Sequence, residues 1–313
     1  MLAAKARAAA HPGTPTAPCS CGSTALATRP DATVVRHAGT VAKAHAPETD
    51  RSALALRVAV AARLPELLLP PLTPAPAPLH GRLVTCWPYG APVDPDDPDA
   101  APWEAAAALL AGLHRTPVPT GLPPMRGPAK AARAVGRLRA ALRTAPHAAA
   151  ARPAARPVLA AWAALPDWAG AAAPMPGPAA LCHGDLHLGQ LVRHPAPDGP
   201  WKLIDVDDLG AGVPAWDLAR PAAWYACGLL PPDEWTRFLT AYRQARGPAV
   251  PVTGDPWPAL DVPARALTVQ TAALAITKAL AADRPLDEVE QALVDACARM
   301  PSPPPGSAPG SPH

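Results

Sequence analysis

The chain has 313 residues, of which 49% are apolar and 17% charged, and its formal net charge is +3 at pH 7. A chain of this length can bury a core large enough for two lobes with a cleft between them. Because the basic residues form no continuous block and no aromatic residues are interleaved with them, the sequence favours neither nucleic acid nor an anionic membrane surface as a partner.

The amino-terminal 18 residues lack the features of a targeting segment. Residues 1–18 contain Lys5 and Arg7 but no continuous apolar run after them, so they do not match a secretory signal and are predicted to form a disordered leader. Elsewhere, no apolar run reaches the roughly 18 residues that a membrane helix needs. We therefore expect a cytoplasmic protein.

Six cysteines are spread along the chain, which predicts reduced thiols rather than a framework of disulfides. Two of them stand close together in the segment Cys19-Ser20-Cys21, a spacing that could supply half of a metal site. The sequence shows no second pair of ligands beside it. A metal site is therefore the less favoured interpretation of this segment.

Residues 23–46 alternate short β-type runs with turn signals, a pattern that is typical of an antiparallel meander. The predicted strands cover residues 24–28, 33–36 and 40–44. Asp50 can cap a following helix over residues 51–64, because apolar residues recur there at helical spacing. A further strand is predicted over residues 83–87, and the proline- and aspartate-rich segment 88–102 is a candidate hinge between lobes.

From Trp103 onward the pattern is mainly helical. The predicted helices cover residues 103–114, 129–143, 157–165, 216–230, 232–245, 263–282 and 286–300. Short strands are expected over residues 181–182, 191–193 and 201–204. The tail over residues 301–313 is rich in proline, serine and glycine, cannot bury a core and is predicted to be disordered.

The strands of this second region flank a segment with the residue types of a phosphoryl-transfer centre. Asp185 lies in the run His183-Gly184-Asp185-Leu186-His187-Leu188-Gly189-Gln190, and Asp205 ends the next strand pair. Phosphoryl transfer needs a group that orients the attacking hydroxyl and oxygen ligands for magnesium. One carboxylate can serve the hydroxyl, and the second carboxylate with the Gln190 amide can serve the metal ion.

This run, the Ile204-Asp205 strand end and the downstream Gly212-Val213-Pro214-Ala215-Trp216-Asp217-Leu218-Ala219 together resemble the aminoglycoside phosphotransferase family. The catalytic loop is also similar to that of the maltose-kinase branch, where glutamine replaces the usual asparagine. The resemblance spans residues 24–298 and is carried mainly by residues 183–219. It implies a protein-kinase-like bilobal α+β fold, with a small antiparallel sheet lobe carrying one helix over residues 19–90 and a larger, mainly helical lobe over 91–300.

The resemblance also implies a role for each residue of the motif. Asp185 matches the catalytic aspartate that orients or deprotonates the acceptor hydroxyl, and His183 buttresses its loop. Asp205 and Gln190 match the magnesium ligands, and Asp217 matches a structural aspartate that bonds the catalytic loop. The implied cofactors are ATP and Mg²⁺.

On the nucleotide side, Lys43 resembles the strand lysine that binds the phosphates, and Trp87 and Tyr89 fall where the adenine-contacting hinge is expected. Two features of the family's pattern are missing. Helix 51–64 contains no glutamate to pair with the lysine, and the first hairpin turn contains no glycine. These departures keep open an alternative function, a pseudokinase that binds a nucleotide or metabolite without turnover.

The expected partner is a small-molecule hydroxyl acceptor, and the sequence predicts no particular protein partner. Asp207 and Asp208 directly follow Asp205, so they are candidates to bind the acceptor, as a polycationic aminoglycoside would require. The segment 130–156 is strongly basic, however, which suits a neutral sugar or another metabolite at least as well. The sequence leaves these acceptors open.

Overall fold

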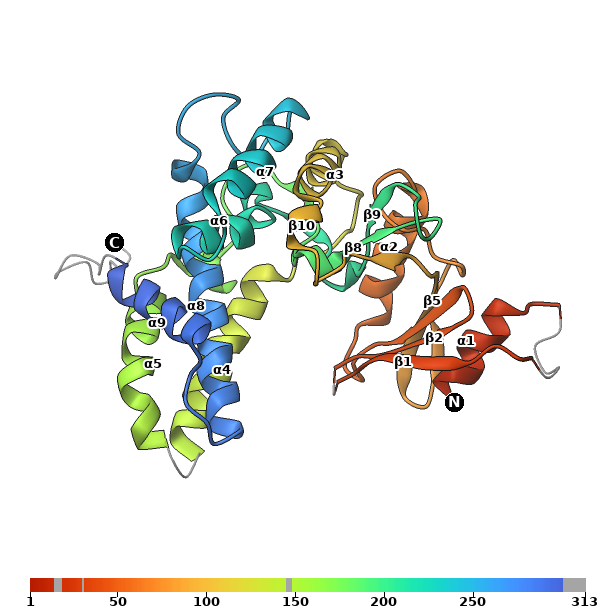
Figure 1. The fold of residues 1–313 in the computed structure, drawn as a ribbon, viewed down its shortest axis with the longest axis horizontal. Coiled ribbons are helices and arrows are strands. Elements are labelled where there is room, and N and C mark those ends of the chain that lie inside the picture. The colour runs from red at the N-terminus through yellow and green to blue at the C-terminus, as the bar shows by residue number, and fades with distance from the viewer. Residues whose placement is uncertain (14–18, 30, 145–147, 301–313) are drawn as a thin grey trace.

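The computed structural model describes residues 1–13, 19–29, 31–144 and 148–300, and it has two lobes (Figure 1). The smaller lobe is built on a five-stranded antiparallel sheet with the order β1-β2-β3-β5-β4. Its strands are β1 (Ser23–Thr28), β2 (Thr33–His37), β3 (Thr40–Ala44), β4 (Ala77–Leu79) and β5 (Arg82–Pro88). The predicted meander is confirmed, whereas β4 lies in a proline-rich stretch where no strand was expected.

Helix α2 (Arg51–Arg63) begins as predicted, because the Asp50 side chain accepts a hydrogen bond of 2.6 Å from the backbone nitrogen of Ala53. A second helix, α1 (Leu2–Ala10), corrects the prediction of a disordered leader for those residues. Its alanine-rich sequence forms helix readily, and its fully buried Ala6 packs against Ala42 and Ala44 of β3. Residues 14–18 of the predicted leader and the predicted disordered tail 301–313 lie outside the described residues.

Strand alternation gives the small sheet two different faces. Ala42 and Ala44 of β3 lie under α1, while Val41 and Lys43 line a pocket on the opposite side. Helix α1 therefore covers the face of the sheet that points away from the pocket.

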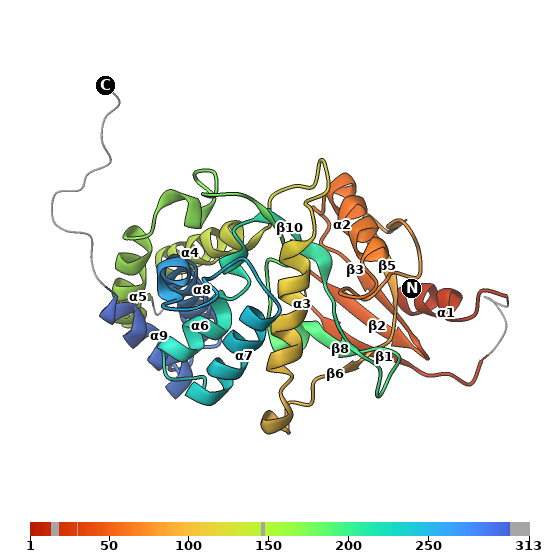
Figure 2. The same ribbon diagram turned by 90° about the horizontal axis from the view of Figure 1, so that it is seen from above.

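The larger lobe is mainly helical, as predicted, and Figure 2 shows α3 lying between its other helices and the sheet of the small lobe. Its helices are α3 (Trp103–Arg115), α4 (Gly127–Thr144), α5 (Ala148–Ala163), α6 (Ala219–Ala226), α7 (Pro232–Gln244), α8 (Trp257–Ala281) and α9 (Glu288–Arg299). Three short antiparallel pairs join β6 (Ala91–Pro92) to β8 (Leu191–Arg193), β8 to β9 (Trp201–Leu203), and β7 (Ala180–Cys182) to β10 (Gly210–Gly212). Because β6 pairs within this lobe, we propose that the lobes divide near residue 90.

Two helices begin well before the residue that the sequence predicted. Helix α8 starts at Trp257 and contains Pro263, and α5 starts at Ala148 and contains Pro153 and Pro157. The predicted ranges, 157–165 and 263–282, each begin at one of these prolines, a residue that is common in the first turn of a helix. The buried face of α8 instead includes both Leu260 and Pro263, so packing outweighs the hydrogen bond that proline removes.

Candidate active site

The loop between β7 and β8 has a backbone that only glycine can form at its second residue. Gly184 has φ +85°, and a Cβ atom there would lie 2.4 Å from the carbonyl oxygen of Asp208. One residue earlier, Nε2 of His183 lies 2.8 Å from the carbonyl oxygen of Ile204. The loop is thereby held against the strand end that carries Asp205.

Asp217 holds the same loop through hydrogen bonds to its backbone. Its carboxylate accepts hydrogen bonds from the backbone nitrogens of His183 at 2.6 Å and Gly184 at 2.7 Å. Nε2 of His114, on α3, lies 2.9 Å from the same carboxylate, and Nδ1 of His114 lies 2.7 Å from the Tyr242 hydroxyl on α7. Since Asp217 and His114 are both buried, this network ties the loop to two helices of the larger lobe.

Asp185 lies between two cations. Lys130 Nζ of α4 lies 2.6 Å from one of its oxygens, and Arg220 of α6 donates to the other at 2.9 Å. Burial alone would raise the pKa of Asp185, but Lys130 and Arg220 outweigh it and lower the pKa to about 2. The carboxylate is therefore ionised at every pH at which the protein is expected to work.

His187, two residues after Asp185, is held in its neutral form. Its Nδ1 accepts a 3.1 Å hydrogen bond from the backbone nitrogen of Gly189, which a protonated ring could not do. Burial and the neighbouring Arg220 lower the pKa of His187 from 6.5 to about 4. Between these two pH values the unfolded chain takes up a proton here that the folded chain does not.

We therefore expect the free energy of unfolding to fall as the pH is lowered from about 6.5 to 4, and His187→Gln to make this fall shallower. Urea unfolding at a series of pH values measures the slope. His80→Asn is the matched control, because His80 is exposed and its φ of +47° suits asparagine. Equal slopes for His187→Gln and the wild type would contradict this assignment.

A second charged cluster lies at the small lobe. Lys43 Nζ is 2.6 Å from Oδ1 of Asp205 and 3.1 Å from Oδ2 of Asp207. Burial would lower the pKa of Lys43, but the two carboxylates outweigh it and hold the pKa above its ordinary value. Asp205 has a left-handed backbone with φ +64°, which is uncommon outside glycine and turns its carboxylate toward Lys43.

The position of Asp207 explains how Lys43 is held without a helix glutamate. Helix α2 contains no glutamate. Its buried Arg57 does not contact Lys43 as a counter-charge but donates a 2.8 Å hydrogen bond to the carbonyl oxygen of Leu209. Asp207 contacts both Lys43 and, at 3.2 Å, Nδ1 of His45. The structure thus places Asp207 on the lysine side of the cleft, where it supplies a second carboxylate to the lysine.

A pocket of about 410 Å³ opens beside this cluster. Its walls are mostly apolar, with Leu26, Val34 and Val41 from the sheet of the small lobe and Val192 and Ile204 from the larger lobe. Several predicted site residues share this lining: Lys43, Trp87, Tyr89, Gln190, Asp205 and Asp207. The hairpin β1–β2 contributes to the pocket although its turn contains no glycine.

The predicted hinge lines the pocket, but the backbone of Tyr89 already has partners. Its nitrogen donates a 2.7 Å hydrogen bond to the carbonyl oxygen of Gly39, and its carbonyl oxygen lies 3.1 Å from Nδ1 of His194. The Trp87 indole nitrogen donates to the Thr85 hydroxyl at 2.8 Å. Tyr89 can therefore contact a ligand chiefly through its side chain.

Lys130 links the two charged clusters. Its Nζ also lies 2.7 Å from Oδ2 of Asp208, which directly follows Asp207. Ion pairs thus run from Lys43 through the 205–208 segment and Lys130 to Asp185. Asp208, predicted from sequence as an acceptor ligand, lies here as a partner of Lys130 and of Arg126, whose Nε is 3.6 Å away.

Two residues of this centre were missed by sequence reasoning, Lys130 and Arg220. A signal existed for the first, since Lys130 is one of only five lysines in the chain. Arg220 directly follows the downstream motif that ends at Ala219. Nothing in their spacing shows that both reach Asp185, because that contact depends on how α4 and α6 pack around the loop.

Comparison with known proteins shows which family and which folds this chain resembles. The model of the phosphotransferase enzyme family matches residues 27–261. No curated protein matches the chain. Among solved structures, a spectinomycin phosphotransferase in complex with ADP and spectinomycin aligns with a TM-score of 0.58 at 13% identity, covering 90% of this chain and 89% of the other.

Two further structures share the fold. A choline/ethanolamine kinase family protein from Mesorhizobium loti aligns with a TM-score of 0.53 at 18% identity, covering 95% of this chain and 92% of the other. A choline kinase from Cryptosporidium parvum aligns with a TM-score of 0.55 at 11% identity, covering 93% and 92%. These likenesses confirm the predicted kinase-like fold.

In the part of the chain that the structure describes, no helix is long and apolar enough to span a bilayer.

Proposed function

The chain belongs to the phosphotransferase enzyme family, and we propose that it transfers the γ-phosphoryl group of ATP to a hydroxyl group of a small molecule. One observation carries this proposal. Two loop carboxylates, Asp185 and Asp205, are each held by a cation, and the 205–208 segment joins the ion pairs of the one, through Asp208 and Lys130, to those of the other beside the apolar pocket. Phosphoryl transfer consists mainly of positioning and charge stabilisation, which is what such an arrangement supplies.

The pocket suits a nucleotide. Its apolar walls, Val34 and Val41 on one side and Val192 on the other, offer a slot for a flat base, and Lys43 lies at its charged end. Because Lys43 is half-buried and its pKa is held above the ordinary value, its ammonium group stays charged and can pair with phosphate oxygens. Asp207 keeps this ammonium group in place, as a helix glutamate would.

The oxygen atoms of Asp205 and Gln190 fit magnesium. Both residues line the pocket, and a carboxylate with an amide oxygen is a donor set that a hard cation accepts. When bound there, Mg²⁺ would neutralise charge on the phosphate oxygens. Lys43 already contacts Asp205 Oδ1, so the lysine and the ion would share this carboxylate.

Asp185 acts on the acceptor in this proposal. A carboxylate with a pKa of about 2 is a weak base, so it serves mainly to accept a hydrogen bond from the hydroxyl and to hold it in line with the phosphate. The proton passes to Asp185 only as the hydroxyl oxygen bonds to the γ-phosphorus and becomes acidic, while the bond from that phosphorus to the bridging oxygen breaks and ADP leaves. Lys130 and Arg220 hold the carboxylate still while this happens.

The charges around Asp185 indicate which acceptors fit. Lys130, Arg220 and Arg126 lie in direct contact with the carboxylates of Asp185 and Asp208, so cations outnumber carboxylates at this end of the cleft. Arg133 on the same face of α4 adds another positive charge near Asp208. We therefore propose a neutral or anionic acceptor, such as a sugar or a sugar acid, over a polycationic aminoglycoside.

Kinetics with magnesium-ATP and three acceptor classes, a neutral sugar, a sugar acid and an aminoglycoside, tests this proposal. We expect kcat/KM to be highest for one of the first two. Arg133→Glu should lower kcat/KM for the anionic acceptor, whereas Arg139→Glu, on another face of α4, should change it much less. If only the aminoglycoside is turned over efficiently, the proposed acceptor class is wrong, while the proposed phosphotransferase activity still holds.

The alternative, a pseudokinase that binds nucleotide without turnover, is favoured by the glycine-free hairpin turn and by the absence of acidic residues from α2. It predicts magnesium-dependent nucleotide binding with no transfer to any acceptor class. Calorimetric binding measured beside the kinetic assay separates the two functions.

A further inference from the structure

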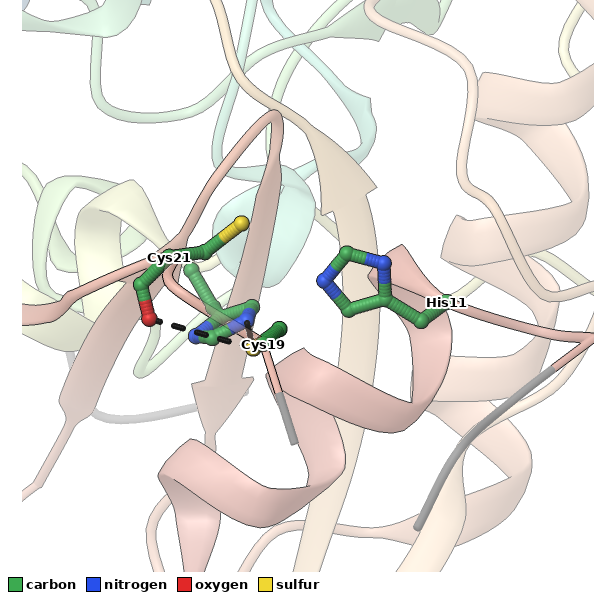
Figure 3. Close-up of side chains that lie close together, drawn as sticks. His11, Cys19 and Cys21 are labelled. Carbon is green, nitrogen blue, oxygen red and sulfur yellow. Dashed lines mark hydrogen bonds between the residues drawn. The ribbon is translucent and has the colours of Figure 1, made fainter. Parts of the chain in front are cut away.

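Four residues with metal-binding side chains meet at the outer side of the small lobe, away from the pocket. They are His11, Cys19, Cys21 and His37, and one ligand atom from each lies within 4.8 Å of all the others. Figure 3 shows the ring of His11, at the end of α1, facing the segment that carries Cys19 and Cys21. The sequence shows only the cysteine pair, because the two histidines reach it from α1 and from the end of β2.

The spacing of the ligand atoms fits a tetrahedral ion. Sγ of Cys19 lies 3.4 Å from Nε2 of His37. Zinc–sulfur bonds of about 2.3 Å and zinc–nitrogen bonds of about 2.0–2.1 Å at a tetrahedral angle place two such atoms about 3.6 Å apart. The observed distance therefore agrees with two neighbouring ligands of one ion.

The histidines are oriented as ligands would be. Nδ1 of His37 lies 2.8 Å from the Ser23 hydroxyl, so a ring protonated at Nδ1 donates to Ser23 and directs the lone pair of Nε2 toward Cys19. Nε2 of His11 is buried and has no hydrogen-bond partner among the described residues. A buried, unpartnered imidazole nitrogen beside two thiols is costly unless it binds something.

We propose that His11, Cys19, Cys21 and His37 bind a structural Zn²⁺ ion. Two thiolates and two imidazoles are a donor set that zinc takes in closed, four-coordinate sites. The ion would join the end of α1 to the base of the β1–β2 hairpin, where Ser23 pairs with His37. Since Leu26 and Val34 of this hairpin line the pocket, the metal would also stiffen one wall of it.

The full chain, prepared without a polyhistidine tag, allows a direct test. Protein stripped of metal by a chelator is titrated with Zn²⁺ and separately with Co²⁺. We expect one Zn²⁺ ion per chain, and with Co²⁺ the visible bands of a tetrahedral site together with a thiolate charge-transfer band. A wild-type chain that gives no thiolate band, or that contains a Cys19–Cys21 disulfide instead, overturns the proposal.

Variants locate the ion. Cys19→Ser, Cys21→Ser and His11→Ala should each lose bound Zn²⁺, and Cys227→Ser, which alters a half-buried cysteine elsewhere, should keep it. In the wild type, Zn²⁺ should protect Cys19 and Cys21 from alkylation while Cys227 still reacts. Unchanged metal content in the first three variants would refute the site. None of these readouts depends on transferase activity, so they stand apart from the proposed reaction.

Discussion

Replacing Asp185 with asparagine should lower kcat for phosphoryl transfer by about 10²–10⁴-fold, the range that a positioned proton acceptor contributes. Asparagine keeps the shape of the side chain, so Lys130 and Arg220 lose a charged partner while the loop keeps its backbone bonds to Asp217. Nucleotide affinity should change little, because Asp185 does not line the apolar pocket that we propose for the nucleotide. Steady-state kinetics and calorimetric ATP binding measure the two quantities.

Asp198→Asn is the control for Asp185→Asn, since Asp198 is exposed on the β8–β9 turn. It should retain wild-type kcat. If Asp185→Asn turns over at the wild-type rate, Asp185 is not the group that positions the acceptor. If the wild type binds magnesium-ATP and transfers to no acceptor, the pseudokinase alternative stands.

The parts of the fold that depend on local sequence could be predicted from it. The hairpin strands are bounded by turn residues, and α2 is opened by a capping aspartate, so short-range patterns were sufficient for both. The position of the loop between β7 and β8 was also predictable, because its residues are contiguous and form a specific motif. The structure places Asp217 where that motif implies, bonded to the backbone of His183 and Gly184.

The contacts that complete the site could not be predicted, since each joins residues far apart in the chain. Lys130 and Asp185 belong to different elements, as do Lys43 and Asp205. The sequence showed that α2 lacks a glutamate, but only the fold shows that Asp207 reaches the lysine. The amino-terminal helix was missed for a related reason: its stability depends on burying Ala6 against β3 rather than on a strong amphipathic pattern.

Replacing Asp217 with alanine should have the largest effect on stability, a loss of about 3–5 kcal/mol in the free energy of unfolding, because it removes one partner from a buried charged network. Three donors would lose their acceptor: the backbone nitrogens of His183 and Gly184 and Nε2 of His114. Urea unfolding measures the change. Asp261→Ala, which breaks an exposed 3.4 Å pair with Arg265, should cost no more than about 1 kcal/mol.

Asp217→Asn distinguishes two contributions of Asp217, the hydrogen bonds that it accepts from the loop and its negative charge. Its amide oxygen can accept from one of the two loop nitrogens, but its NH₂ group then faces the other donor. The variant should therefore fold more stably than Asp217→Ala and still show a reduced kcat, because the loop that carries Asp185 is held by one bond instead of two. A wild-type kcat in Asp217→Asn would mean that packing around His183 positions the loop without the carboxylate.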